Sequence, residues 1–377
     1  MVANSGGPAR RPGPALVDGW YRWFLPEHRS FGDVINRWPE RLRPLVWRYG
    51  AVRAITLVVA GRKHDAVAAI RRDRGWRCLV LLSALLSSRP KLVVLHFIDN
   101  DLRRPGVHRL IDACWQPIER WALRRTMARA QVLTVWEGRR YAEEYGVEQE
   151  RFRFVPFAWR HPPGGAAPQF AEAAARAGVV AAGRVSCDWP TLFAAAQGQD
   201  WPLTVVCSAA HRVLVESLNR DGRATVLTDI PQSAVQALLR RAAISVIATY
   251  DAGMSQGHVR LCESVDAGAP IVATRTRSLE GYVEEDRTAV LVAPGAPEAL
   301  RDAIEGLLAD PAHRDRLAQA AWSRAERWTW DDYLAGLSAL MRGERSGAPQ
   351  AAASACAPES SLREITLDTP SEPIDTP

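Results

Sequence analysis

One stretch in the second half of the chain constrains the fold more than any other. An apolar run over residues 244–249 predicts a buried strand, and a polar loop that contains glycine follows it. Residues 259–267 then have helical spacing, with Leu261 on the inner side, and Gly268 lies where that helix should end. A further short apolar strand is expected at 271–274. The stretch therefore predicts a strand–helix–strand unit of a parallel sheet.

The loop before this helix has the composition of an anion site. A helix that begins beside the carboxyl end of a parallel strand presents unpaired N–H groups and a positive dipole end, which suits a diphosphate. Gly257 would let the backbone approach such a ligand, and Ser255, His258 and Val259 surround it in the sequence. Glu263 can direct a carboxylate toward a ribose diol or a sugar hydroxyl. The competing interpretations are that Glu263 caps local N–H groups and that His258 is structural.

These residues resemble the donor-site signature of GT-B glycosyltransferases, most closely the large retaining glycosyltransferase family 4 (glycosyl transferases group 1). In that family two glutamates eight positions apart precede a segment of the form Ala-x-Gly-x-Pro-Val-Val-Ala-Thr. Glu263 matches the second glutamate, which binds the nucleotide ribose, and residues 267–274 match the segment that follows. The first glutamate, which contacts the donor sugar, is replaced by Ser255. The resemblance covers most of residues 178–342 and is weak over the N-terminal half.

The same resemblance assigns a role to Arg184. In the family a Gly-Arg pair ends the first strand of the second domain, and its arginine clamps the donor diphosphate together with a lysine a few residues further on. Gly183-Arg184 matches this pair, but the lysine has no counterpart because the only lysines are Lys63 and Lys91. The resemblance therefore implies a donor site of Arg184, Ser255, Gly257, His258, Val259 and Glu263, without a cofactor or a metal.

Composition and charge favour two soluble domains with different surfaces. The chain has 377 residues, of which 47% are hydrophobic and 24% charged, enough for two ordinary domains. Residues 1–176 carry 30 Arg and Lys against 16 Asp and Glu, and nine of the 14 Trp; residues 177–377 carry 18 against 26. Arginine interleaved with tryptophan suits an anionic membrane surface or a polyanionic acceptor, and equally a solvated basic face over a Trp-containing core. No secretory signal or membrane-spanning segment is visible, so we expect a cytoplasmic protein. The basic, Trp-rich half also allows a peripheral position on the inner face of the membrane.

The order of the predicted elements gives a domain plan. We expect an α/β protein of the GT-B fold, two Rossmann-like domains facing across a cleft: an acceptor-binding domain at 16–160, a nucleotide-sugar-binding domain at 177–342, and a disordered tail at 343–377. In the first domain, 54–60 and 92–98 are predicted as parallel strands. In the second domain we predict strands at 178–182, 203–207, 225–227, 244–248 and 271–274.

Candidate catalytic and metal residues are fewer in the first half. His96 follows the predicted strand at 92–95; in related enzymes a histidine at a comparable strand end lies near the donor sugar, and a satisfied core histidine is the competing interpretation. Asp99-Asn100-Asp101 has the Asp-x-Asp form of a divalent-metal site, which a GT-B fold does not use. The six cysteines have no metal-ligand spacing and are read as buried apolar residues.

These observations predict an enzyme, a hexosyltransferase-like glycosyltransferase of polysaccharide biosynthesis. It would move a sugar from a nucleotide-diphosphate donor to a glycan, lipid-linked or small-molecule acceptor, with retention and without a metal, and it would not bind nucleic acid. A pyridoxal-phosphate phosphorylase of similar architecture is excluded, since its cofactor lysine is missing. A sugar-nucleotide epimerase remains an alternative. A second alternative is a catalytically impaired protein that only binds a nucleotide or a partner, and Ser255 and the missing lysine favour it.

Overall fold

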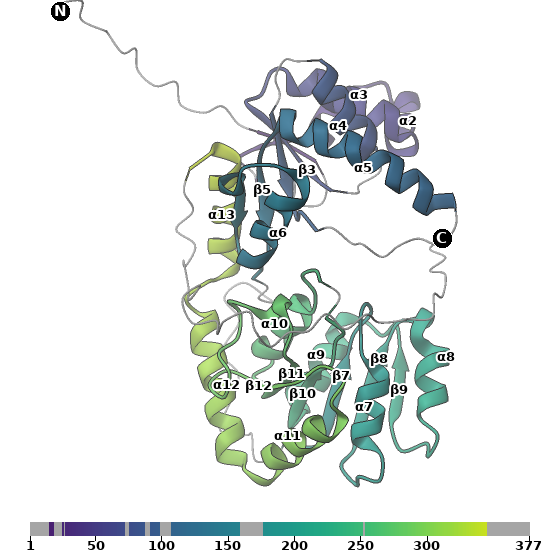
Figure 1. Ribbon diagram of the computed structural model, residues 1–377, viewed down its shortest axis with the longest axis vertical. Helices are drawn as coiled ribbons and strands as arrows, with labels where there is room; N and C mark the ends of the chain where they lie inside the picture. Colours follow the sequence, from purple (N-terminus) through teal and green to yellow (C-terminus); the bar gives the residue numbers. More distant parts are fainter. Residues whose placement is uncertain are drawn as a thin grey trace, which may run out of the picture. The chain divides into compact units, whose positions relative to one another are not determined.

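The computed structural model describes residues 15–18, 25, 27–71, 75–86, 91–98, 107–158, 176–251 and 253–344, and these divide into two compact units. The first unit takes the described residues up to Val132, then Gly138–Val155 and 334–344. The second takes Leu133–Glu137 and Pro156–Tyr333. Figure 1 shows the strands and helices of both units. Nearly all of the predicted tail lies outside the described residues.

The first unit holds a six-stranded parallel sheet in the order β2-β1-β3-β4-β5-β6. Its strands are β1 (Leu16–Val17), β2 (Arg29–Ser30), β3 (Ala66–Ile70), β4 (Lys91–Leu95), β5 (Met127–Val132) and β6 (Phe152–Phe154). Its helical elements are α1 (Phe31–Ile35), η2 (Glu40–Leu42), α2 (Arg43–Arg48), α3 (Gly50–Gly61), α4 (Trp76–Leu85), α5 (Val107–Thr126), η3 (Gln149–Arg151) and most of α6 (Val135–Tyr145) and α13 (Trp330–Arg342).

The strand predicted at 54–60 is wrong, because these residues lie within helix α3. Ala54, Leu57 and Val58 are buried at helical spacing, whereas their neighbours Ile55 and Val59 are about half exposed. The strand is instead β3, whose alanine-rich sequence gives little β propensity. A short apolar run does not distinguish a strand from a helix by its periodicity. The strand predicted at 92–98 is confirmed in its first part, as β4.

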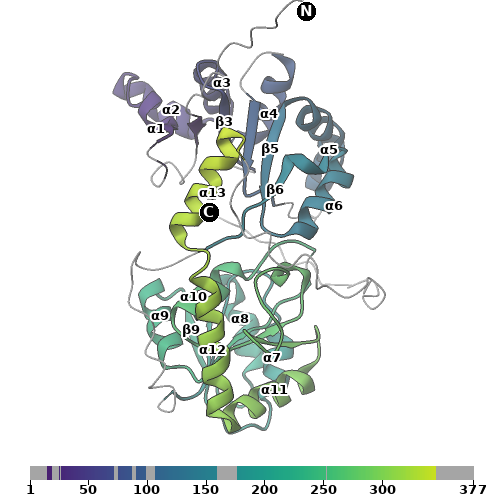
Figure 2. The ribbon, with the colours of Figure 1, turned by 90° about the vertical axis from the view of Figure 1, so that its left-hand side faces the viewer.

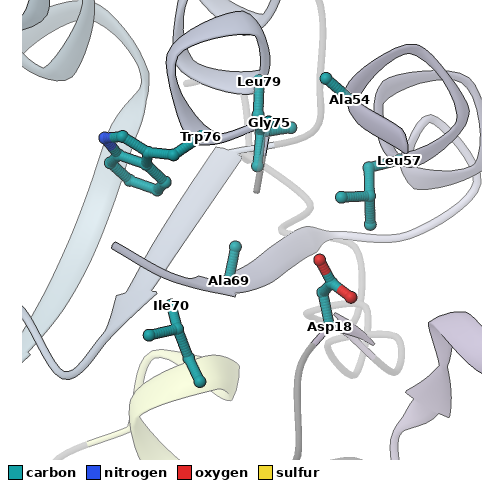
Figure 3. A pocket seen from close by; sticks show the side chains of 8 residues that line it. All are labelled: Asp18, Ala54, Leu57, Ala69, Ile70, Gly75, Trp76 and Leu79. Atoms are coloured by element: carbon teal, nitrogen blue, oxygen red, sulfur yellow. The ribbon is translucent and has the colours of Figure 1, made fainter. Parts of the chain in front are cut away.

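Helices α3 and α4 approach each other closely where they begin. Gly75, the N-cap of α4, has φ +92°, and a Cβ placed on it would lie 2.3 Å from the carbonyl oxygen of Gly50. A residue with a Cβ would therefore be strained at position 75, both by the positive φ and by contact with the backbone of Gly50. Beside this contact lies a small, mainly apolar pocket into which Asp18 points; it is lined also by residues of α3, β3 and α4 (Figure 3).

The second unit holds a six-stranded parallel sheet in the order β12-β11-β10-β7-β8-β9. Its strands are β7 (Val179–Ala182), β8 (Leu203–Cys207), β9 (Thr225–Thr228), β10 (Ile244–Ile247), β11 (Ile271–Thr274) and β12 (Val290–Val292). Its helical elements are α7 (Trp189–Ala196), α8 (Ala209–Leu218), α9 (Gln232–Arg241), α10 (His258–Asp266), η5 (Arg277–Leu279), α11 (Pro297–Ala309) and α12 (Pro311–Ala325).

Helices cover both faces of this second sheet, because alternate side chains of its strand β7 pack in two different apolar clusters. Val179 and Ala181 of β7 pack in one apolar cluster with α7, α8 and α11, and Val180 and Ala182 pack in another with α9. Helix α10 packs against α9 and α12, as Figure 2 shows from the side. Strands buried on both faces are nearly continuously apolar, which is why the strands of this unit were predicted close to their observed bounds. The predicted α/β class is confirmed.

Candidate functional site

The carboxyl ends of β7, β9 and β10 bring polar residues together at one edge of the second sheet. Arg184 follows β7, Asp229 follows β9, and the loop after β10 leads to α10. Gly257 is the N-cap of α10 with φ +80°, and a Cβ on it would lie 3.5 Å from Ile247 Cγ2. Only glycine adopts this conformation without strain, so it permits the sharp entry into the helix. Ligands of open α/β sheets bind at this edge.

Arg184 lies at the surface with its guanidinium held by one carboxylate. Its Nη2 donates to Asp229 Oδ1 at 3.1 Å, and 69% of the Arg184 side chain is exposed. Asp229 has φ 48°, and its second oxygen accepts from the N–H of Ala209 at 3.0 Å, where α8 begins. Asp229 belongs to no motif of the sequence, although its place directly after a predicted strand is a signal that could have indicated it. An exposed pair of this kind contributes at most about 1 kcal/mol, so Arg184 can exchange its partner for a ligand.

Glu263 is buried one turn into α10 and is held by two side chains. Its Oε1 accepts from Gln232 Nε2 at 2.9 Å, and its Oε2 forms an ion pair with Nη1 of Arg260. Arg260 in turn donates from Nε to the carbonyl oxygen of Ala182 at 3.1 Å. These contacts hold the carboxylate near the carboxyl end of β7. The contact of Glu263 with ribose remains a prediction. Arg260 and Gln232 were not singled out in the sequence, since neither belongs to the motif.

The loop before α10 is anchored by a carboxylate from a distant part of the chain. Glu137, fully buried, accepts from the N–H of Ser255 at 2.7 Å with Oε1 and from the N–H of Leu133 at 3.2 Å with Oε2. Its own N–H donates to Thr134 Oγ1 at 3.2 Å, so the Thr134 hydroxyl caps the start of α6. One buried carboxylate therefore orders both a helix start and the predicted site loop.

Two side-chain oxygens of this loop are buried without a hydrogen-bond partner among the described residues. They are Ser255 Oγ and Gln256 Oε1. Leaving a buried polar atom unpaired costs about 1–3 kcal/mol, which makes such atoms candidates for contact with a ligand. Val259, at the second position of α10, has a half-exposed side chain. Its N–H is one of the N–H groups at the helix start that have no intrahelical partner.

His258, the first residue of α10, is buried and neutral. Its Nε2 lies 2.6 Å from the carbonyl oxygen of Ser278 and therefore donates to it, and its ring packs on Tyr282 with centroids 4.2 Å apart. Burial lowers the pKa of His258 to about 4. A contact of His258 with phosphate or sugar, as predicted, would have to use Nδ1, because Nε2 already has a partner.

His96 belongs to the first unit and follows β4 with φ 48°. Its N–H donates to Gln131 Oε1 at 3.1 Å, and Gln131 Nε2 donates to the carbonyl oxygen of Val155 at 3.1 Å. A non-glycine residue in this backbone region is a candidate functional position. The Asp-x-Asp tripeptide at 99–101 lies outside the described residues. The described part of the chain contains no group of three or more His, Cys, Asp or Glu placed to hold a metal, and no helix there is long and apolar enough to cross a membrane.

Comparison with known proteins confirms the resemblance read from the sequence. Residues 179–310 match the family described as Glycosyl transferases group 1. D-inositol 3-phosphate glycosyltransferase of Corynebacterium urealyticum is 36% identical over 100 residues, which are 26% of this chain and 23% of the relative. The Corynebacterium glutamicum protein of that name is 32% identical over 130 residues, 34% of this chain and 30% of the relative. The chain thus matches less than a third of the length of these curated relatives.

Solved structures extend the likeness to both units. Anabaena HepE in complex with UDP superposes with a TM-score of 0.62 at 14% identity, covering 87% of this chain and 99% of that one. Sucrose-phosphate synthase from Thermosynechococcus elongatus gives a TM-score of 0.63 at 19% identity, covering 84% of each chain. At these identities the likeness shows the fold alone, and the fold is GT-B, as predicted.

Proposed function

We propose that the protein is a glycosyltransferase that binds a nucleotide-diphosphate sugar at the carboxyl edge of its second sheet. The observation that carries this proposal is the convergence of Arg184, the N-terminus of α10 and Glu263 at that edge, within the residues that match the glycosyltransferase family. Because HepE was solved with UDP and with UDP-glucose, UDP-sugars are the first donors to test.

The chemistry of this edge suits a reaction driven by stabilisation of the leaving diphosphate. Negative charge grows on the diphosphate as the bond to the sugar breaks, and the guanidinium of Arg184 and the N–H groups at the start of α10 are placed to stabilise it. No metal or other cofactor is needed in this scheme. We further propose retention of the anomeric configuration, with the departing phosphate helping to deprotonate the acceptor hydroxyl, and His96 as a residue near the transferred sugar.

The first unit is proposed to bind the acceptor at an anionic membrane surface. Helices α2 to α5 pack against one another in series and expose both large apolar side chains and cations. The exposed apolar residues include Leu45, Trp47, Ile55, Val59, Leu85, Leu86, Ile111, Ile118 and Trp121. Exposed arginines among them include Arg48, Arg62 and Arg77. This combination supports a lipid-linked acceptor, a role in polysaccharide assembly and a position on the inner face of the membrane.

The donor proposal is tested by incubating the full chain with a panel of nucleotides and nucleotide sugars. We expect one diphosphate to raise the thermal midpoint, and the matching sugar donor to be hydrolysed slowly, also in the presence of EDTA. Loss of hydrolysis in EDTA and recovery with Mn²⁺ would contradict the metal-free scheme. NMR of the product distinguishes retention from inversion.

Glu263 provides a sharper test of how the donor is held. Glu263→Gln keeps the shape of the side chain and removes its charge, and losing a hydrogen bond to a charged acceptor should cost about 1.5–3 kcal/mol of UDP affinity. Titration calorimetry measures this loss. The matched control is Glu305→Gln on α11, a glutamate at the solvent-exposed side of the same unit. Equal UDP affinity of wild type and Glu263→Gln would refute the ribose contact.

The membrane proposal is tested by sedimentation with vesicles of phosphatidylglycerol and phosphatidylcholine at low and high salt. We expect binding that weakens with salt and with the double substitution Trp47→Ser and Val59→Ser. Val213→Ser on α8 of the second unit is the control, since Val213 is 78% exposed. Binding that only the Val213 substitution weakens would contradict the assignment to the first unit.

A second candidate function is a non-catalytic protein that only binds the nucleotide. The observation that favours it is Ser255, whose N–H is bound by Glu137 at the position where the family places a sugar-binding glutamate. Nucleotide binding without hydrolysis or transfer of any donor would select this candidate.

A further inference from the structure

Arg260 is a cation with 17% of its side chain exposed, and it has no role in the chemistry proposed above. It lies on α10, and its Nε donates to the carbonyl oxygen of Ala182, the last residue of β7. The guanidinium therefore reaches the end of the strand whose continuation, two residues on, is Arg184. Arg184 after β7 and Arg260 on α10 are thus both placed at the carboxyl end of β7.

The contacts of Arg260 leave part of its guanidinium available. Nε is used by Ala182, and Nη1 pairs with Oε2 of Glu263. Nη2 donates to no group in the described part of the chain. A guanidinium carries five N–H donors in a rigid fork, and two of them are on Nη2. These two are free to bind an anion.

The charge balance around Arg260 favours an anionic ligand. Burial lowers the pKa of Arg260, and the positive charge of Arg184 lowers it further, whereas Glu263 raises it. Like charges disfavour each other's charged form, so the two arginines repel one another. A diphosphate between them would remove this repulsion and replace it with charge-assisted hydrogen bonds.

We propose that Arg260 supplies the second cation of the diphosphate site, binding the donor with Nη2 while its Nε and Nη1 remain on Ala182 and Glu263. This rests on the proposed function and deepens it. Because the chain has no lysine after Lys91, the second unit must take this charge from arginine.

The competing role is that Arg260 only positions Glu263. The two roles predict different losses of affinity for different ligands. Uridine presents a ribose without phosphate, and inorganic pyrophosphate presents the phosphates without ribose. We would measure the affinity of the full chain for UDP, pyrophosphate and uridine, by calorimetry and by ligand-observed NMR for the weak ligands. The variants are Arg260→Gln and Arg260→Lys.

We expect Arg260→Gln to weaken UDP and pyrophosphate at least tenfold and to change uridine by less than about twofold, and Arg260→Lys to recover much of the UDP affinity through its charge. The matched control is Arg314→Gln. Arg314 is buried in the second unit and donates to the carbonyl oxygens of Leu307 at 2.8 Å and Leu308 at 2.9 Å. Circular dichroism and urea unfolding of all variants separate ligand effects from loss of the fold.

Three results would overturn the inference. Equal losses for UDP and uridine would reduce Arg260 to a positioning residue, and an unchanged affinity for pyrophosphate would remove it from the diphosphate site. A wild-type protein that binds neither UDP, GDP, ADP nor pyrophosphate would overturn the proposed function itself, and the wild-type titration alone reveals that case.

Discussion

The two units place charged residues at corresponding strand ends but enclose them differently. In the first unit Asp18 follows β1 and accepts from Arg53 at 2.8 and 3.1 Å, and Arg71 follows β3 and pairs with Glu119 at 3.3 Å. The side chains of all four are at most 10% exposed. In the second unit the Arg184–Asp229 pair is open to solvent.

This difference separates pairs that hold the fold from pairs that can bind a ligand. Trp76 Nε1 donates to Glu119 at 2.7 Å, so the buried pair of the first unit is part of a closed network that joins β3, α4 and α5. Breaking such a pair leaves an uncompensated buried charge. The exposed pair of the second unit costs little to open, which is the property a ligand-binding arginine needs.

The largest effect is expected where the network is closed. Glu119→Ala should lower the free energy of unfolding of the first unit by about 3–5 kcal/mol, since Arg71 and Trp76 lose their partner. Asp229→Ala should cost less than about 1 kcal/mol. Urea denaturation measures both losses, and hydrogen exchange of the β3 and β4 peptides tests whether the larger loss falls on the first unit. Similar costs for the two substitutions would contradict the distinction between the buried pair of the first unit and the exposed pair of the second.

The second unit also contains a titratable side chain that is shielded from solvent, the buried His258. The pKa of His258 is lowered from 6.5 to about 4 by burial, so the unfolded chain binds its proton first as the pH falls. Its contribution to stability is therefore complete above pH 6.5 and is lost progressively between pH 6.5 and about 4, amounting to about 3 kcal/mol.

We expect His258→Gln to show a correspondingly smaller loss of stability between pH 7.5 and 4.5 than wild type, by about 2–3 kcal/mol. Urea unfolding at the two pH values measures this difference. His313→Gln, at a partly exposed histidine of α12, is the control and should retain the wild-type pH dependence. A wild-type dependence in His258→Gln would contradict a depressed pKa.

The exposed Arg184–Asp229 pair predicts an effect on the rate of donor hydrolysis. Arg184→Ala should slow donor hydrolysis about a hundredfold, because charge on the leaving phosphate grows toward the transition state, and should weaken ground-state UDP binding much less. Steady-state kinetics and calorimetry compare the two. Arg223→Ala, an exposed arginine paired with Asp221 in the same unit, is the control. A loss of binding that equals the loss of rate would argue against a transition-state role.

The smallest effect concerns Asp229, which competes with the ligand for Arg184. Asp229→Asn keeps an oxygen that can accept from the N–H of Ala209 and removes the competing charge. UDP affinity should rise by up to about fivefold, which corresponds to the strength of an exposed ion pair. A fall in affinity, measured by calorimetry, would mean that Asp229 orients Arg184 for binding.

The sequence alone predicted the strands of the second unit more closely than those of the first, for identifiable reasons. Strands such as β8 and β10 are continuous apolar runs bounded by loops, and β8 was predicted with its observed bounds of Leu203–Cys207. In the first unit the apolar run at 54–60 belongs to α3, and the two-residue strand β1 was not recognised. A strand of two residues has no periodicity, so only its pairing with β2 and β3 defines it.

The sequence by itself determined the α/β class, the GT-B family resemblance of the second half, and the residues Arg184, Gly257 and Glu263 as candidates for the donor site, because these depend on local patterns and motif spacing. Only the tertiary structure revealed Arg260, Asp229 and Glu137. Glu137 lies 118 positions before Ser255, whose N–H it binds, and Arg260 lies 78 positions after Ala182, whose carbonyl it binds. Such contacts depend on which strand ends are brought together by the order of the sheet, and a sequence pattern does not contain that order.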